Sequence, residues 1–268
     1  SYQIFTEWSH RALVAVIGIL VAYSHYTAWS LRDKIGNRVY RIHFVSSMFL
    51  ILQAVLGYVT VDLDNAPWTV SLHLFMALIF TISLITVGLI WWKEQSGLPE
   101  SFRTLEISKR LKKYIGYMAI IVLVQLMIGA YLSTSYHRAA CGIGFYSGWP
   151  LCQNSIIPVL KQFGTILNYG HRLSAIVVGG LLLYVEREAR NEFKDSKSIV
   201  TKMLEVTGLF YFVNIILGGL YVVTAVDGEF RGWLSLIHLL VGACVFLTLA
   251  TIYLLTNLTA TKEENVSN

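Results

Sequence analysis

The stretch WLSLIHLLVGACVFLTLATIYLLT, residues 233–256, decides the fold class, because its 24 residues include no charged side chain. A helix of about 20 apolar residues crosses the hydrocarbon core of a bilayer. In lipid, only helices and closed barrels satisfy every backbone polar group, and a run of this length is a helix. The stretch is therefore predicted to be a membrane-spanning helix.

Six similar apolar runs precede it, and the composition agrees with a membrane protein. The 268 residues are 55% hydrophobic and only 14% charged, whereas soluble domains carry about a quarter charged residues. We expect an all-α membrane protein with seven visible transmembrane helices. The net charge of +5 comes from lysines and arginines between the runs, so it does not indicate binding of nucleic acid. The six runs are 12–31, 41–61, 68–92, 114–133, 165–185 and 204–226.

The basic residues alternate between loops and so predict the orientation. The loops after the first, third and fifth runs are rich in lysine and arginine, and the positive-inside rule places them in the cytoplasm. The long loop of about residues 134–164 then lies outside, and we expect a multi-pass protein of the cell membrane. Four tryptophans fall near the outer helix ends, as an aromatic belt would: Trp8, Trp68, Trp149 and Trp233.

An internal repeat divides the chain into halves. Residues 7–11 (EWSHR) match residues 168–172 (NYGHR), and both open a helix that runs inward. Similar segments around His73 and His238 follow at nearly equal spacing, which indicates a parallel duplication. A third pattern recurs on the outward-running helices as Gln53–Gly57, Gln125–Gly129 and Asn214–Gly218.

The duplication predicts the domain organisation. The first half is 1–92, a cytoplasmic linker is 93–113, the second half is 114–258, and a cytoplasmic tail is 259–268. The second half holds four helices and the first only three. We therefore expect a missing helix before Ser1, eight helices in the full-length protein, and two pseudo-symmetric four-helix halves.

Four histidines, His10, His73, His171 and His238, lie at the same outer depth on helices that run inward. An ionisable side chain within a membrane is a functional hypothesis by default, although a lone histidine can be a helix–helix hydrogen bond. Two imidazoles on neighbouring helices suit the axial ligation of haem iron. A zinc site is less favoured because no cysteine or carboxylate cluster accompanies the pairs. The pattern predicts two haem sites.

Neighbouring residues fit such sites. Arg11 and Arg172 each follow the first histidine of a pair, and arginine binds a carboxylate such as a haem propionate bidentately. The alternative is that these arginines extend to lipid headgroups. Small residues on the intervening helices allow close approach of the flat macrocycle, and these are Gly57, Gly129, Gly218 and Gly219.

The repeat breaks at one position. Glu7 precedes His10 by three residues and shares its helix face, while the matching residue, Asn168, cannot take up or release a proton. Our hypothesis is that the first half performs chemistry and the second holds a permanent cofactor. The alternative is that Glu7 is a first-turn carboxylate favoured by the helix dipole.

Cys141 and Cys152 lie in the outer loop, within the sequence CGIGFYSGWPLC. Because the outside of a cell is oxidising, we expect a disulfide between them. Closing this loop would stabilise it by roughly 3 kcal/mol in the chain-entropy model. A redox role for the pair is the alternative.

Taken together, these residues resemble the haem A synthase family over essentially the whole chain. The motifs are Glu7-x-x-His10-Arg11, His73, His171-Arg172, His238, and Trp149-Pro150-Leu151-Cys152 with Cys141. The resemblance implies eight helices in two four-helix halves. The chain departs from the family at Gly129-Ala130, where an arginine often follows and here does not.

The resemblance also implies a reaction, in which a ring methyl of haem O is oxidised to a formyl group to give haem A for terminal oxidases. His10 and His73 would be axial ligands of the substrate haem, and His171 and His238 would ligate a haem b. Glu7 would assist proton movement. The implied partners are membrane lipid, haem O synthase, oxidase assembly factors and an electron-transfer partner that is not identified. The oligomeric state stays open, a homo-oligomer included.

Two rival functions remain. A bis-histidine b-type cytochrome that transfers electrons from quinol, resembling cytochrome b561, explains the four histidines. It does not explain the difference between Glu7 and Asn168, or the cysteine loop. A transporter or assembly scaffold without haem explains the duplication but leaves four membrane histidines without a role.

Overall fold

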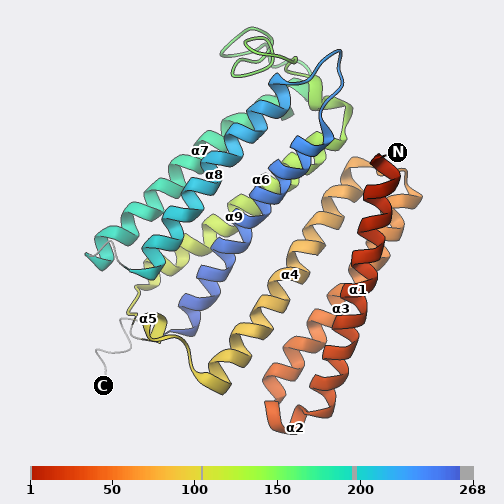
Figure 1. Ribbon diagram of the computed structural model, residues 1–268. Helices are drawn as coiled ribbons and strands as arrows, with labels where there is room; N and C mark the ends of the chain where they lie inside the picture. Colours follow the sequence, from red (N-terminus) through yellow and green to blue (C-terminus); the bar gives the residue numbers. More distant parts are fainter. Residues whose placement is uncertain (1, 104, 195–197, 260–268) are drawn as a thin grey trace.

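The computed structural model describes residues 2–103, 105–194 and 198–259, and most of them are helical (Figure 1). Within this part of the chain, seven helices are long and apolar enough to cross a membrane, which confirms the predicted all-α membrane fold. They are α1 (Tyr2–Ser30), α3 (Asn37–Asp62), α4 (Pro67–Ser96), α6 (Lys109–Thr134), α7 (Phe163–Phe193), α8 (Ile199–Val223) and α9 (Gly232–Leu258). The shorter elements are α2 (Arg32–Ile35), α5 (Glu100–Arg103) and the 3-10 helix η1 (Tyr136–Ala139).

Most helices extend beyond the apolar runs that predict them. The first is already helical at the motif 7–11, and α7 continues to Phe193. An apolar run marks only the hydrocarbon core, whereas the backbone hydrogen bonds of a helix continue into the polar headgroup region. The predicted linker 93–113 accordingly includes the last turn of α4 and the first turn of α6. Of the predicted tail, residues 260–268 lie outside the described residues.

Helices α6 to α9 form a closed four-helix ring. Helix α6 packs against α7 and α9, and α8 packs against the same two helices from the other side. Helices α7 and α9 are therefore diagonally opposed. Figure 1 shows these four helices side by side, with the long loop after α6 at the same end as the N-terminus. This end is the predicted outer face.

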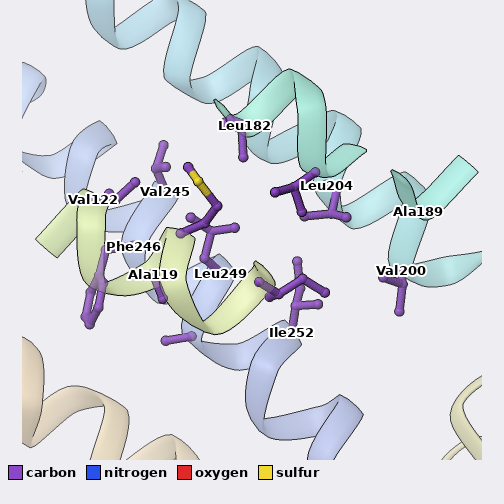
Figure 2. Packing of buried hydrophobic residues seen from close by; sticks show 14 of the residues in the cluster. Ala119, Val122, Leu182, Ala189, Val200, Leu204, Val245, Phe246, Leu249 and Ile252 are labelled. Atoms are coloured by element: carbon purple, nitrogen blue, oxygen red, sulfur yellow. The ribbon is translucent and has the colours of Figure 1, made fainter. Parts of the chain in front are cut away.

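The half of the ring nearer the predicted cytoplasmic face is filled by apolar side chains. Ile115, Leu204, Leu249 and Ile252 are completely buried, and Leu182 is nearly so. Figure 2 shows how these side chains from α7, α8 and α9 converge on α6. Lipid tails are as apolar as these residues, so close van der Waals packing stabilises this region.

The first half is more open. Helix α3 packs against both α1 and α4, whereas α1 and α4 make no extensive contact with each other in the described chain. Helix α4 joins the halves by packing against α6 and α9. Under the duplication, α1, α3 and α4 correspond to α7, α8 and α9, and the described residues hold no counterpart of α6.

Candidate functional site

The half of the four-helix ring nearer the predicted outer face contains a cavity of about 320 Å³, a size typical of ligand sites. His171 on α7 and His238 on α9 both line it. The structure therefore brings the second predicted pair together, from diagonally opposed helices, at one cavity. The two imidazoles are close enough to interact electrostatically.

The ring of His238 is held by the backbone of α8. Its Nδ1 lies 2.9 Å from the carbonyl oxygen of Asn214, so this nitrogen carries the proton and donates. The lone pair is then on Nε2, which is the usual arrangement of a histidine metal ligand whose second nitrogen donates to a carbonyl. His238 is thus prepared to bind a metal through Nε2.

His171 is held by a side chain of α6. The Gln125 amide nitrogen donates to the backbone oxygen of His171 at 2.8 Å and lies 3.1 Å from its Nδ1. Ser174 donates to the Gln125 amide oxygen at 2.7 Å, which fixes the orientation of the amide. Gln125 was not recognised as a site residue in the sequence, although its recurrence in the repeat was a signal.

Arg172 is turned toward the cavity and the outer loop, not toward headgroups. Its Nη1 donates to the carbonyl oxygens of Gly148 and, at 3.0 Å, Leu151. Its Nη2 is buried and has no hydrogen-bond acceptor among the described residues. A buried cationic donor without an acceptor is costly, and a carboxylate in the cavity would satisfy it.

The outer loop caps the cavity. Cys141 and Cys152 form the predicted disulfide, with Cα atoms 4.4 Å apart and both residues buried. Trp149 and Pro150, within the disulfide loop, line the cavity. A Cβ built on Gly219, which also lines the cavity, would lie 2.7 Å from the Trp149 ring, so this glycine makes room for the cap.

Asn168 has a structural role, which its alignment with Glu7 in the repeat does not reveal. Its side chain is buried, and its amide donates to the backbone oxygens of His137 at 3.2 Å and Arg138 at 3.0 Å. These bonds join the first turns of α7 to η1. Asparagine at this position therefore anchors the cap, which a carboxylate could not do.

The first pair is more exposed. His10 lies on the exposed surface of α1, and His73 on α4 is partly buried and within electrostatic reach of it. The Gln53 amide nitrogen lies 3.2 Å from His73 Nε2, and His73 Nδ1 is buried with no partner among the described residues. Arg11 bonds the Glu7 carboxylate at 2.6 Å, and both side chains are more than half exposed.

Two further histidines bond to serines near the predicted cytoplasmic ends of α1 and α3. Ser47 Oγ lies 2.9 Å from His25 Nδ1, and Ser24 Oγ lies 2.6 Å from His43 Nε2. These two imidazoles are therefore hydrogen-bonded and lie apart from the four histidines at the other end of the helices.

The fold and the cavity define a class: a multi-pass membrane protein with paired histidines at one end of its helices. The family model described as cytochrome oxidase assembly protein matches residues 1–250. The chain belongs to this family, which confirms the resemblance seen in the sequence.

Curated relatives carry the name heme A synthase. The Exiguobacterium sp. protein is 23% identical over 92% of this chain and 74% of its own length. The Geobacillus thermodenitrificans protein is 25% identical over 94% of this chain and 75% of its own. The Staphylococcus aureus (strain bovine RF122 / ET3-1) protein is 26% identical over 82% of this chain and 69% of its own.

Proposed function

We propose that this protein is a haem A synthase, which oxidises a ring methyl of haem O to a formyl group and gives haem A for terminal oxidases. The observation that carries the proposal is the capped cavity, where His171, His238 and the unpaired Nη2 of Arg172 converge. Membership of the oxidase assembly family and the names of the relatives support it.

The cavity residues fit a resident haem b. His171 and His238 would hold its iron, and Arg172 would bind a propionate through Nη2. When bound, this haem would supply one-electron transfer. The lining of the cavity is mainly apolar, with further polar residues such as Gln125, Arg138 and Asn168, and Trp149 and Pro150 of the cap would shield the haem from water.

In the first half, we propose that His10 and His73 hold the iron of the substrate, haem O. When the oxygen atom comes from water, oxidation of a methyl to a formyl group releases four electrons and four protons. The electrons must pass to the electron-transfer partner, and the protons must be accepted near the reacting carbon. Glu7 lies one turn before His10 and is the proposed acceptor. It is bonded to Arg11, whose release would free the carboxylate to take a proton.

The surroundings of His10 suit a farnesylated substrate. Trp8 and Leu13 lie within one turn of His10 on α1 and are both more than 60% exposed. These apolar surfaces would contact the farnesyl tail. We place the histidine-bearing helix ends at the outer face of the cell membrane, with haem O synthase as donor of the substrate and an oxidase assembly factor as a partner.

The first experiment is extraction of haem from the purified full-length protein. Haem O or haem A together with haem b supports the synthase. Haem b alone would instead identify an electron-transfer cytochrome, and a protein without haem would identify a scaffold.

The second experiment is turnover of haem O by the purified protein, with haem A measured by chromatography. Glu7→Gln should lose haem A formation while retaining haem b. Glu229→Gln, an exposed carboxylate in the loop between α8 and α9, is the matched control and should keep wild-type turnover. Full turnover by Glu7→Gln would remove this residue from the proposed mechanism.

A further inference from the structure

Three outward-running helices share a pattern that the proposed reaction does not use. An amide residue is followed four positions later by glycine: Gln53 and Gly57 on α3, Gln125 and Gly129 on α6, Asn214 and Gly218 on α8. Residues four apart lie on the same helix face. In each case this face contacts a histidine on the next long helix of the chain.

Each glycine contacts the imidazole itself. A Cβ built on Gly57 would lie 3.2 Å from Cε1 of His73. The same distance is 3.0 Å between Gly129 and His171, and 2.9 Å between Gly218 and His238. The atom approached is Cε1 in all three, so the ring edge between the two nitrogens lies against the helix backbone. A side chain at any of the three positions would push the ring away.

Each amide residue engages one nitrogen of the same ring. Gln53 Nε2 is 3.2 Å from His73 Nε2, and Gln125 Nε2 is 3.1 Å from His171 Nδ1. Asn214 does this with its backbone oxygen, 2.9 Å from His238 Nδ1. The Asn214 carbonyl accepts from Nδ1 and so leaves the lone pair of His238 Nε2 free for a metal. The Gln53 and Gln125 amide nitrogens can only donate, so they orient the rings of His73 and His171 without selecting a coordinating nitrogen.

We propose that these three amide–glycine pairs are positioning residues that set the ring orientation of His73, His171 and His238, and that the backbone oxygen of Asn214 also selects the coordinating nitrogen of His238. The inference rests on the proposed function, because it takes these histidines as haem ligands. Two contacts per ring, one at a nitrogen and one at Cε1, fix the rotation of the ring plane. Outer partners of this kind alter metal affinity by about 10- to 100-fold when they are mutated.

The test begins with Gly129→Ala and Gly218→Ala in the full-length protein loaded with haem b. We expect about 10- to 100-fold weaker haem binding and shifted electron paramagnetic resonance g values of the ferric haem, because the ring planes rotate. Gly180→Ala on α7 is the matched control, since a Cβ there meets nothing within 4 Å. Alanine is favoured over glycine within a helix, so this control should keep the wild-type spectrum and stability.

Gln125→Met tests the amide separately, because it keeps the side-chain length and adds no group to the crowded Gly129 contact. It should shift the g values and the reduction potential of the bound haem while the melting temperature of the haem-free protein stays unchanged. Gly57→Ala should leave the haem b spectrum unchanged and weaken binding of haem O, because Gly57 contacts His73, which lies in the first half of the chain.

The outcomes separate two failures. If the wild-type protein binds no haem, or if His238→Ala retains a normal haem spectrum, the proposed function is refuted and this inference with it. If Gly129→Ala, Gly218→Ala and Gln125→Met bind haem with the affinity and spectrum of Gly180→Ala, only the positioning role is refuted. Should one glycine variant fail to accumulate, the other and Gln125→Met still decide the question.

Discussion

Replacement of Asn168 by aspartate should detach the cap from α7. The Asn168 side chain is 2% exposed, and its amide nitrogen is the donor to the oxygens of His137 and Arg138. Asn168→Asp changes little in shape but removes the donor. At neutral pH the new side chain is a carboxylate, and one of its oxygens would face the carbonyl oxygens of His137 and Arg138, which repel it.

The magnitude follows from those contacts. Two hydrogen bonds contribute about 1 kcal/mol each, and a buried carbonyl left without a donor costs about 1–3 kcal/mol more. The sum is about 3–5 kcal/mol. Because every 1.4 kcal/mol is a factor of ten, the population with an open cap should rise about 100-fold or more. At acid pH a protonated carboxyl can donate one bond, so the defect should shrink as pH falls.

The rate of reduction of the Cys141–Cys152 disulfide by a mild thiol reports this opening, because both cysteines are buried when the cap is closed. Free thiols are followed by labelling after a quench. Asn154→Asp makes the same chemical change at an exposed position of the same loop and should reduce at the wild-type rate. Equal rates for Asn168→Asp and Asn154→Asp would refute the reasoning.

Three further predictions follow from the second half. Joint replacement of Cys141 and Cys152 by serine should cost roughly 3 kcal/mol of unfolding free energy, seen as a lower melting temperature; an unchanged melting curve would contradict it. Arg172→Gln should weaken haem b binding about 10- to 100-fold, because a hydrogen bond to a charged group contributes about 1.5–3 kcal/mol. The same variant should bind haem b dimethyl ester, whose propionates carry no charge, as well as the wild type does. Equal losses of affinity for both haems would exclude pairing of Arg172 with a propionate. Leu249→Ala, in the packed inner half, should cost about 2–5 kcal/mol, whereas Leu183→Ala on the exposed face of α7 should cost far less; similar melting temperatures would argue against the packed core.

The helical architecture could be predicted because lipid imposes a simple rule on the sequence. An uncharged run such as 233–256 must form a helix within the membrane. It corresponds to α9 (Gly232–Leu258) in the structure. Helix ends were less predictable, because polar residues such as those of motif 7–11 are compatible with both helix and loop. The disulfide was predictable because two cysteines lie 11 residues apart in the one long loop that is predicted to lie outside the cell.

The partners of the site residues were not predictable, because they come from backbone atoms of an irregular loop. Arg172 bonds carbonyl oxygens of Gly148 and Leu151, and no sequence pattern marks a carbonyl. Glycines on the intervening helices were recognised from the repeat but assigned to the macrocycle. All three line the cavity, and the contacts that the sequence did not predict are those of Gly129 and Gly218 with imidazoles and of Gly219 with Trp149.

The packed inner half of the ring bears on how turnover responds to the voltage across the membrane. In the proposed orientation, the completely buried apolar side chains around Leu249 and Ile252 lie between the cavity and the cytoplasm. Moving one elementary charge across a membrane at 100 mV involves about 2.3 kcal/mol. Protons released at the histidine-bearing ends would leave on the same side without crossing that field. Proton release by this route would add no dependence of the reaction rate on the membrane voltage.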